Sequence, residues 1–221
     1  AATDQTTDTP TNNFATTNPL NYGTNFTWSE GNLQISQAST NWDTTYSTIG
    51  VSSGKWYWEF KGTAGLYYDI GVTDVIAPTA NISTNSGCVA YKSNSEFARA
   101  GSVGGGLPSN ITDPASSEWT TNDIMSIALD VDNEAVYFAK NGTWEVSSDP
   151  ESGASKTGAV TLPNSGSTYF FAFAVYGSPG TGIANFGNPP YANSSDAADA
   201  DGYGAFEYAP PSGYFALNTK N

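Results

Sequence analysis

Residues 125–142 read MSIALDVDNEAVYFAKNG, and this stretch decides the fold class. Its first half alternates apolar residues with small or polar ones, which is the pattern of a β-strand. Asp132-Asn133 turns the chain, an apolar run returns, and Asn141-Gly142 marks a second tight turn, the strongest short signal of a hairpin. The stretch therefore predicts an antiparallel hairpin with one face on a core. The alternating apolar residues are Met125, Ile127, Leu129 and Val131.

Other strand patterns lie on both sides of this hairpin. Residues 55–61, KWYWEFK, place two Trp and a Phe on one face and Tyr, Glu and Lys on the other, which predicts a half-buried strand. Residues 169–176, YFFAFAVY, are apolar on both faces and predict a central strand that is covered on both sides. Residues 26–35 predict a further hairpin that bends at Glu30-Gly31-Asn32.

The composition agrees with these strands. Six Trp, thirteen Tyr and eleven Phe supply core material of the kind that fits a pleated sheet. No window repeats apolar residues at helical spacing over three turns. About ten short strands separated by turns predict an all-β fold, a two-layer antiparallel sandwich. The predicted organisation is an extended arm or linker over residues 1–13 and a single sandwich domain over 14–221, with long loops at 101–121 and 147–164.

Charge limits the class of partner. Seven Lys+Arg against 21 Asp+Glu give a net charge of −14 without any His, so the surface repels nucleic acid and anionic membranes. The acidity indicates either solubility in salt or the binding of cations or basic partners. No apolar run is long enough for a membrane span and none reads as a signal peptide. Because the chain starts at Ala1 rather than Met, we expect a processed product or a piece of a longer protein.

Several kinds of chemistry are disfavoured by residue type. Without His there is no Ser-His-Asp or Cys-His arrangement, and we expect no enzyme activity. Cys88 is the single cysteine, so it forms no internal disulfide, and its strand-like surroundings predict a buried apolar role. Acids such as Asp130 and Asp132 flank a predicted hairpin, where they favour the turn itself. No cofactor is therefore expected.

Four segments, in order along the chain, resemble the SPRY (B30.2-like) family. Residues 53–59, SGKWYWE, resemble its early GKxYWE strand, and residues 69–72, DIGV, resemble the IGV strand that follows. Residues 129–142 are similar to its LDxD…VxFxxNG hairpin, the most specific of these pieces. Residues 169–177 and 185–187 resemble its two closing strands. The resemblance implies a concanavalin-like jelly roll without a cofactor that binds through loops at one end; it transfers no functional residue.

The two ends resemble a narrower group. Residues 9–20 and 206–219 are similar to the segments that flank SPRY-like domains of bacteriophage virion proteins. This resemblance implies a non-enzymatic virion or extracellular module, such as a tail fibre, a head fibre or a capsid decoration. It would bind other virion proteins, or a protein or glycan of the host surface, as part of a homo-oligomer or larger assembly. The alternative is a secreted cellular adhesin or filament subunit that assembles by strand addition.

Two sets of residues are candidates for ligand or metal contact. Aromatic residues in or beside turns offer rigid contact area with a polar handle, which suits protein and sugar ligands, although they can also plug the ends of the sandwich. These are Trp42, Tyr46, Tyr67, Tyr91 and Trp119. Residues 196–202 carry three acids and a glycine, which indicates either a solvated acidic loop or a weak Ca²⁺ site. The possible calcium ligands are Asp196, Asp199 and Asp201.

Overall fold

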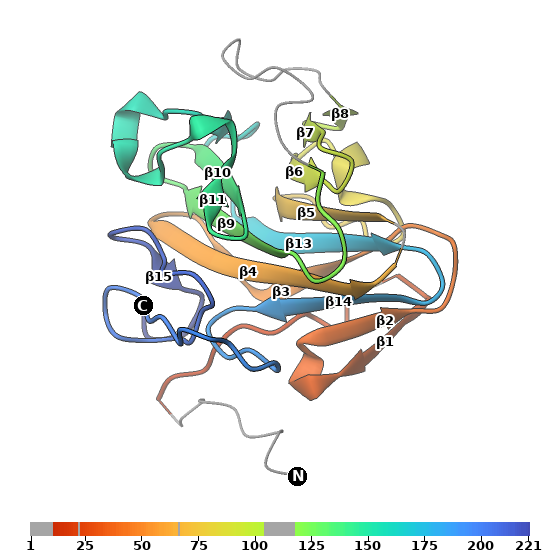
Figure 1. Ribbon diagram of the computed structural model, residues 1–221. Helices are drawn as coiled ribbons and strands as arrows, with labels where there is room; N and C mark the ends of the chain where they lie inside the picture. The colour runs from red at the N-terminus through yellow and green to blue at the C-terminus, as the bar shows by residue number, and fades with distance from the viewer. Residues whose placement is uncertain (1–10, 22, 66, 104–117) are drawn as a thin grey trace.

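The fold consists of two β-sheets packed face to face, in a computed structural model that describes residues 11–21, 23–65, 67–103 and 118–221 (Figure 1). Neighbouring strands are antiparallel, except that β15 runs parallel to β4. The all-β, two-layer antiparallel sandwich predicted from the sequence is therefore confirmed.

The elements of the larger sheet come from all parts of the chain. In spatial order they are β1 (Phe26–Ser29), β2 (Gln34–Gln37), β14 (Gly180–Asn185), β4 (Lys55–Ala64), β9 (Ile124–Asp130), β10 (Ala135–Lys140) and β11 (Thr143–Trp144), with β12 (Val160–Thr161) beside β10 and β15 (Phe215–Ala216) beside β4. The smaller sheet has the order β3 (Asp43–Val51), β13 (Tyr169–Tyr176), β5 (Tyr67–Thr73), β6 (Cys88–Lys92), β7 (Phe97–Arg99) and β8 (Ser102–Val103). Short 3-10 turns are η2 (Glu30–Asn32), η3 (Ile82–Thr84), η4 (Glu145–Ser147) and η5 (Pro150–Ser155).

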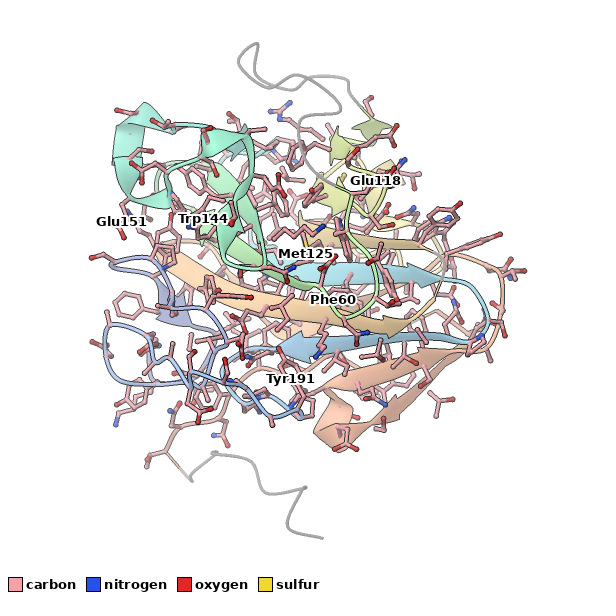
Figure 2. All side chains as sticks on the ribbon, viewed as in Figure 1. Phe60, Glu118, Met125, Trp144, Glu151 and Tyr191 are labelled. Atoms are coloured by element: carbon pink, nitrogen blue, oxygen red, sulfur yellow. The ribbon has the colours of Figure 1, made fainter. Side chains whose placement is uncertain are left out.

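The hairpin predicted at residues 125–142 forms between β9 and β10. Asp130 closes its turn by accepting hydrogen bonds from the backbone N–H and the Nδ2 of Asn133, at 2.9 and 2.8 Å. Asn141 and Gly142 both have positive φ, 48° and 78°, as a two-residue hairpin turn requires. Met125 is fully buried and lies opposite Phe60 of β4, and Figure 2 shows the two side chains close together in the middle of the molecule.

The core between the sheets is strongly aromatic. Trp58 of β4 is fully buried and packs against Phe171 and Phe173 of β13 and against Phe186, with ring centroids 5.3, 6.2 and 5.4 Å apart. The predicted central strand is confirmed, because β13 lies between β3 and β5 and is buried along most of its length. On its outer face Ala172 and Ala174 belong to a smaller cluster under η3, and this cluster includes the buried Cys88.

The prediction that strand 55–61 is half-buried is wrong, since β4 is covered on both faces. Its outer face carries Tyr57 and Glu59, which are 1% and 0% exposed. Phe206 and Tyr214, from the C-terminal segment (residues 187–221), pack over Tyr57. Alternation in the sequence indicates which residues share a face, but it does not show that a distant segment covers the polar-looking face.

The predicted arm and loops are described in part. Residues 1–10 and 104–117 lie outside the described residues. Asn12 is buried, and Asn13 exchanges hydrogen bonds with Thr219, so these two residues of the predicted arm pack on the C-terminal segment. Residues 147–164 contain η5 and β12 rather than irregular chain alone. Within the described residues, no helix is long and apolar enough to span a membrane.

Candidate ligand-binding surface

A row of three aromatic side chains lies on the outer face of the six-stranded sheet. Trp42 precedes β3, Tyr176 ends β13 and Tyr67 begins β5, and the register pairs Tyr176 with Tyr67. These ends of the three strands meet at one end of the sandwich, at the right of Figure 1. The Tyr176 ring lies 5.3 Å from that of Trp42 and 6.0 Å from that of Tyr67. We call these three residues the aromatic row.

The aromatic row is accessible. Tyr67 is 50% exposed and is one of three exposed large hydrophobic residues in the described part of the chain, with Leu20 and Val75. Trp42 and Tyr176 are partly buried, because their rings pack against each other and Trp42 also packs against the small cluster on the outer face of the sheet. The row is therefore held in place by packing from below and still faces solvent, as a binding surface requires.

An open hollow adjoins each end of the aromatic row. The hollow beside Trp42 has a volume of about 450 Å³, and the one beside Tyr67 about 300 Å³. Their linings are rich in hydroxyl and amide side chains. The first hollow is lined by Thr24, Asn25, Asn41, Trp42, Asp43, Thr79, Ala80, Asn81 and Thr84, and the second by Tyr67, Ser93, Asn94, Glu118, Trp119 and Thr120.

Hydrogen bonds hold the first hollow in shape. The Asp43 carboxylate accepts from the backbone N–H and the Nδ2 of Asn25, at 3.3 and 2.7 Å. The Thr44 hydroxyl donates to the Ala80 carbonyl at 2.5 Å, and Gln37 Nε2 donates to the Asn41 carbonyl at 3.0 Å. Three separate segments of chain are thereby joined, so the lining is ordered before any ligand arrives.

The second hollow is built around a buried tryptophan. Trp119 donates from Nε1 to the carbonyl of Lys92 at 3.0 Å, and its backbone N–H donates to the carbonyl of Ser93 at 3.1 Å. Lys92 in turn pairs with Glu96 at 2.5 Å. The segment that carries Glu118 is therefore tied to the end of β6, next to Tyr67.

Three of the five aromatic residues predicted to contact a ligand are buried instead. Tyr46, Tyr91 and Trp119 are 2%, 0% and 1% exposed. The Tyr46 hydroxyl accepts a hydrogen bond from the Ala77 N–H at 2.9 Å. Trp119 stacks on Tyr68, 5.6 Å between centroids. A large ring beside a turn closes the end of a core as readily as it faces solvent, because its apolar body gains from burial while its polar tip finds a partner.

Trp42 and Tyr67 are brought together, and Tyr176 completes the row although the sequence did not mark it. Tyr176 falls in the run predicted to be a central strand covered on both sides. It lies at the last position of β13, just before the turn at Gly177, and is partly exposed, whereas the five residues before it are buried. The usable signal was the position of an aromatic residue at the junction of an apolar run and a turn.

Asp69 introduces a buried charge behind the aromatic row. It follows Tyr67 by two residues on β5 and therefore points to the same side of the sheet. It is 1% exposed, and one of its carboxyl oxygens has no hydrogen-bond partner. Burial raises the pKa of Asp69 to about 6, against hydrogen bonds from Ser83 and Asn81 and the charge of Lys92, which lower it.

Replacing Asp69 by Asn is expected to weaken the dependence of stability on pH. The folded state holds the Asp69 proton up to about pH 6, whereas the unfolded chain loses it near pH 4, so stability is present at low pH and is lost as the pH rises through this window. The loss from Asp69 is about 2 kcal/mol between pH 4 and pH 7. Urea unfolding at several pH values measures it.

Glu59 also contributes to the dependence of stability on pH, and its contribution serves as an internal reference for this experiment. Burial also raises the pKa of Glu59 to about 6, so Glu59 lowers stability over the same pH range. Asp69→Asn should therefore lose the contribution of Asp69 and keep that of Glu59. A variant with the full wild-type slope would contradict the assignment to Asp69.

The loop at residues 196–202 does not bring its three possible calcium ligands together. Asp199 is buried, and its two oxygens accept hydrogen bonds from the backbone N–H groups of Asp201, Tyr203 and Ala216 and from Asn221 Nδ2, at 2.7 to 3.0 Å. Asp196 and Asp201 are exposed. Within the described part of the chain, no three His, Cys, Asp or Glu side chains gather as metal ligands. Asp199 instead anchors the end of the chain.

Comparison with known proteins gives matches in structure. No family profile and no curated protein sequence matches the chain. The human HERC1 SPRY domain aligns with a TM-score of 0.58 and 16% identity, over 76% of this chain and 96% of that domain. The chain has a SPRY-like fold. The TRIM65 PSpry domain aligns at 0.54 and 10% identity, over 78% of this chain and 92% of that domain.

Part of a larger toxin chain also aligns with this fold. The stonustoxin structure aligns with a TM-score of 0.53 and 16% identity, over 78% of this chain and 27% of the toxin chain. At these identities the likeness concerns the fold alone. Function therefore has to be argued from the aromatic row and the hollows beside it.

Proposed function

We propose that this chain is a non-enzymatic recognition module that binds its ligand through the aromatic row. The observation that carries the proposal is the contact of Trp42, Tyr176 and Tyr67 on one solvent-facing platform between two polar hollows. Exposed Trp and Tyr side chains supply large contact area at a low cost in conformational entropy. The hollows supply hydrogen-bonding groups in fixed positions.

The roles of the buried acids support a binding role over a catalytic one. Glu59 and Asp130, the acids on neighbouring strands β4 and β9, are both 0% exposed. Glu59 holds the C-terminal segment, and Asp130 closes the β9–β10 turn and pairs with Lys55 at 3.3 Å. A glycosidase would need two carboxylates that face one open sugar cleft.

We place this module on the surface of a phage virion or outside a cell, with other virion proteins or a host surface as partners. The support is the resemblance of residues 9–20 and 206–219 to segments that flank such domains. Residues 14–15 and 217–218 also lie side by side, because Phe14 bridges to Asn218 and Ala15 donates to the Leu217 carbonyl at 2.8 Å. This pairing suits a module that is attached at one side and binds with the other.

The alternative of assembly by strand addition has less support. The outer edge of β3 is already occupied, since Asn18 donates to the Tyr46 carbonyl and Thr48 to the Thr16 carbonyl, both at 2.8 Å. An incoming strand would have to displace residues 16–18 or use a different edge.

Binding to bacterial envelopes tests the proposed function. Fluorescently labelled protein is added to a panel of bacterial cells and outer-membrane vesicles, and the Trp42→Ala and Tyr67→Ala variants are compared with the wild type. We expect about tenfold weaker binding for each variant. Trp144→Ala is the matched control, because Trp144 is a half-buried Trp on β11 of the other sheet, in the left half of Figure 2.

The results distinguish binding through the aromatic row from nonspecific adsorption. Retained binding by Trp144→Ala, together with loss in the two variants of the aromatic row, supports the proposal. Equal binding by all four proteins, or binding by none of them to any envelope, would overturn it. Circular dichroism confirms that each variant is folded.

A further inference from the structure

We infer that the ligand of the aromatic row is a neutral oligosaccharide. This inference rests on the proposed function and adds the chemical class of the ligand. It follows from three properties of the surface, which are the shape of the row, the hydrogen-bonding groups of the hollows and the charge around them.

The shape of the row favours a ligand made of several rings. The Tyr176 ring is tilted by 37° to that of Trp42 and by 47° to that of Tyr67. A single flat ligand such as a nucleobase cannot lie on all three rings at once. A chain of sugar rings can turn from one residue to the next and so follow a platform that bends with the twisted sheet. The apolar C–H face of each sugar then packs on an aromatic ring.

The polar side chains that line the two hollows can hydrogen-bond to the hydroxyl groups of a sugar. Five of the side chains that line the hollows are Thr or Ser with a hydroxyl that both donates and accepts, and three are Asn beside Trp42. A sugar hydroxyl needs such paired donors and acceptors. These groups stand at both ends of the row, so the terminal sugars of a bound chain would meet them while the middle sugar lies over Tyr176.

The charge around the row disfavours an acidic ligand. Asp43 and Glu118 line the two hollows, and the residues that line them include no Lys or Arg. Lys92, which lies opposite Asp69 on the neighbouring strand β6, is engaged by Glu96. With a net charge of −14 over the chain, sialylated, sulfated or phosphorylated sugars would be repelled.

The surface is poor in the apolar area that a protein partner needs. A stable protein interface buries about 800 Å² on each side around an apolar or aromatic centre. In the described part of the chain, the exposed large apolar residues other than Tyr67 are Leu20 and Val75. The row alone offers a narrow contact, which fits a sugar chain better than a folded protein.

A glycan array with matched neutral and acidic oligosaccharides tests this inference. We expect binding to neutral gluco-, galacto- or manno-oligosaccharides of three or more residues and none to their sialylated or sulfated forms. Trp42→Ala and Tyr67→Ala should weaken this binding about tenfold, whereas Trp42→Phe and Trp144→Ala should retain it. Affinity for a neutral glycan should also change little between 50 mM and 500 mM NaCl.

The other outcomes separate this inference from the proposed function. Two outcomes would overturn the neutral-sugar ligand but not the proposed recognition function. One is binding to acidic glycans through the aromatic row. The other is binding to envelopes that depends on the row and is lost after protease treatment of the cells. Binding that is unaffected by Trp42→Ala and Tyr67→Ala would overturn both.

Discussion

Replacing Glu59 by Ala is expected to lower the free energy of unfolding by about 3–5 kcal/mol, because it removes a buried acceptor that holds the C-terminal segment. One Glu59 oxygen accepts from the Tyr57 hydroxyl and the Tyr208 N–H, at 3.1 and 2.8 Å. The other accepts from Asn185 Nδ2 and the Glu207 N–H, both at 3.0 Å. Without the carboxylate the backbone N–H groups of Glu207 and Tyr208 lose their acceptor in a partly buried region.

The loss should be largest in the C-terminal segment. Hydrogen exchange at the amides of Glu207 and Tyr208 should speed up more than exchange in β9, because only the former donate to Glu59. Urea unfolding gives the total change. Glu59→Gln should fall between the wild type and Glu59→Ala, since it keeps the shape and one acceptor oxygen but turns an NH₂ group toward N–H donors.

Glu207→Ala is the matched control for this prediction. Its carboxylate lies in the same segment but accepts from Ser194 at the surface, so its loss should cost less than about 1 kcal/mol. If Glu59→Ala and Glu207→Ala cost the same, Glu59 does not hold the segment in place.

Replacing Trp58 by Ala should cost about 3–5 kcal/mol through a cavity between the two sheets. The indole stacks on Phe186 with an angle of 13° between the planes and contacts Phe171 and Phe173 of the opposite sheet. Close-packed neighbours of this kind collapse only in part around an empty site. Thermal and urea unfolding measure the loss.

Two further variants show that the cavity causes this effect. Trp56→Ala removes the same side chain two residues earlier on β4, where Trp56 is only partly buried, and should cost less than half as much. Trp58→Phe should cost less than Trp58→Ala, because the ring remains and a buried indole N–H without a partner is removed. A cost for Trp56→Ala equal to that of Trp58→Ala would contradict the central role of Trp58.

The fold was largely predictable because strand periodicity and turn chemistry are local. The alternation around Ile127 and the Asn141-Gly142 turn depend on residues within a few positions of one another, and both predictions are confirmed. The glycine of the IGV segment shows where local reasoning stops. A Cβ on Gly71 would lie 2.0 Å from the carbonyl oxygen of Val89. Glycine is therefore needed at this position because β6 approaches closely, and not because the chain turns.

The candidate site was predictable only in part. Trp42 and Tyr67 are accessible to solvent, as the predicted ligand contact requires, but Tyr46, Tyr91 and Trp119 carry the same local signal and are buried. Whether a ring beside a turn faces water depends on what packs over it, and those contacts come from residues far away in the chain.

The fold class, the main hairpins, the central strand and the turn role of Asp130 could be predicted from local sequence, because hydrophobic alternation and turn residues act over a few positions. The burial of Glu59 under the C-terminal segment and the contact of Trp42, Tyr176 and Tyr67 in one row became apparent only in the folded chain. Both depend on strands that are distant in sequence and neighbours in a sheet, and the pairing of such strands is set by the packing of the whole core.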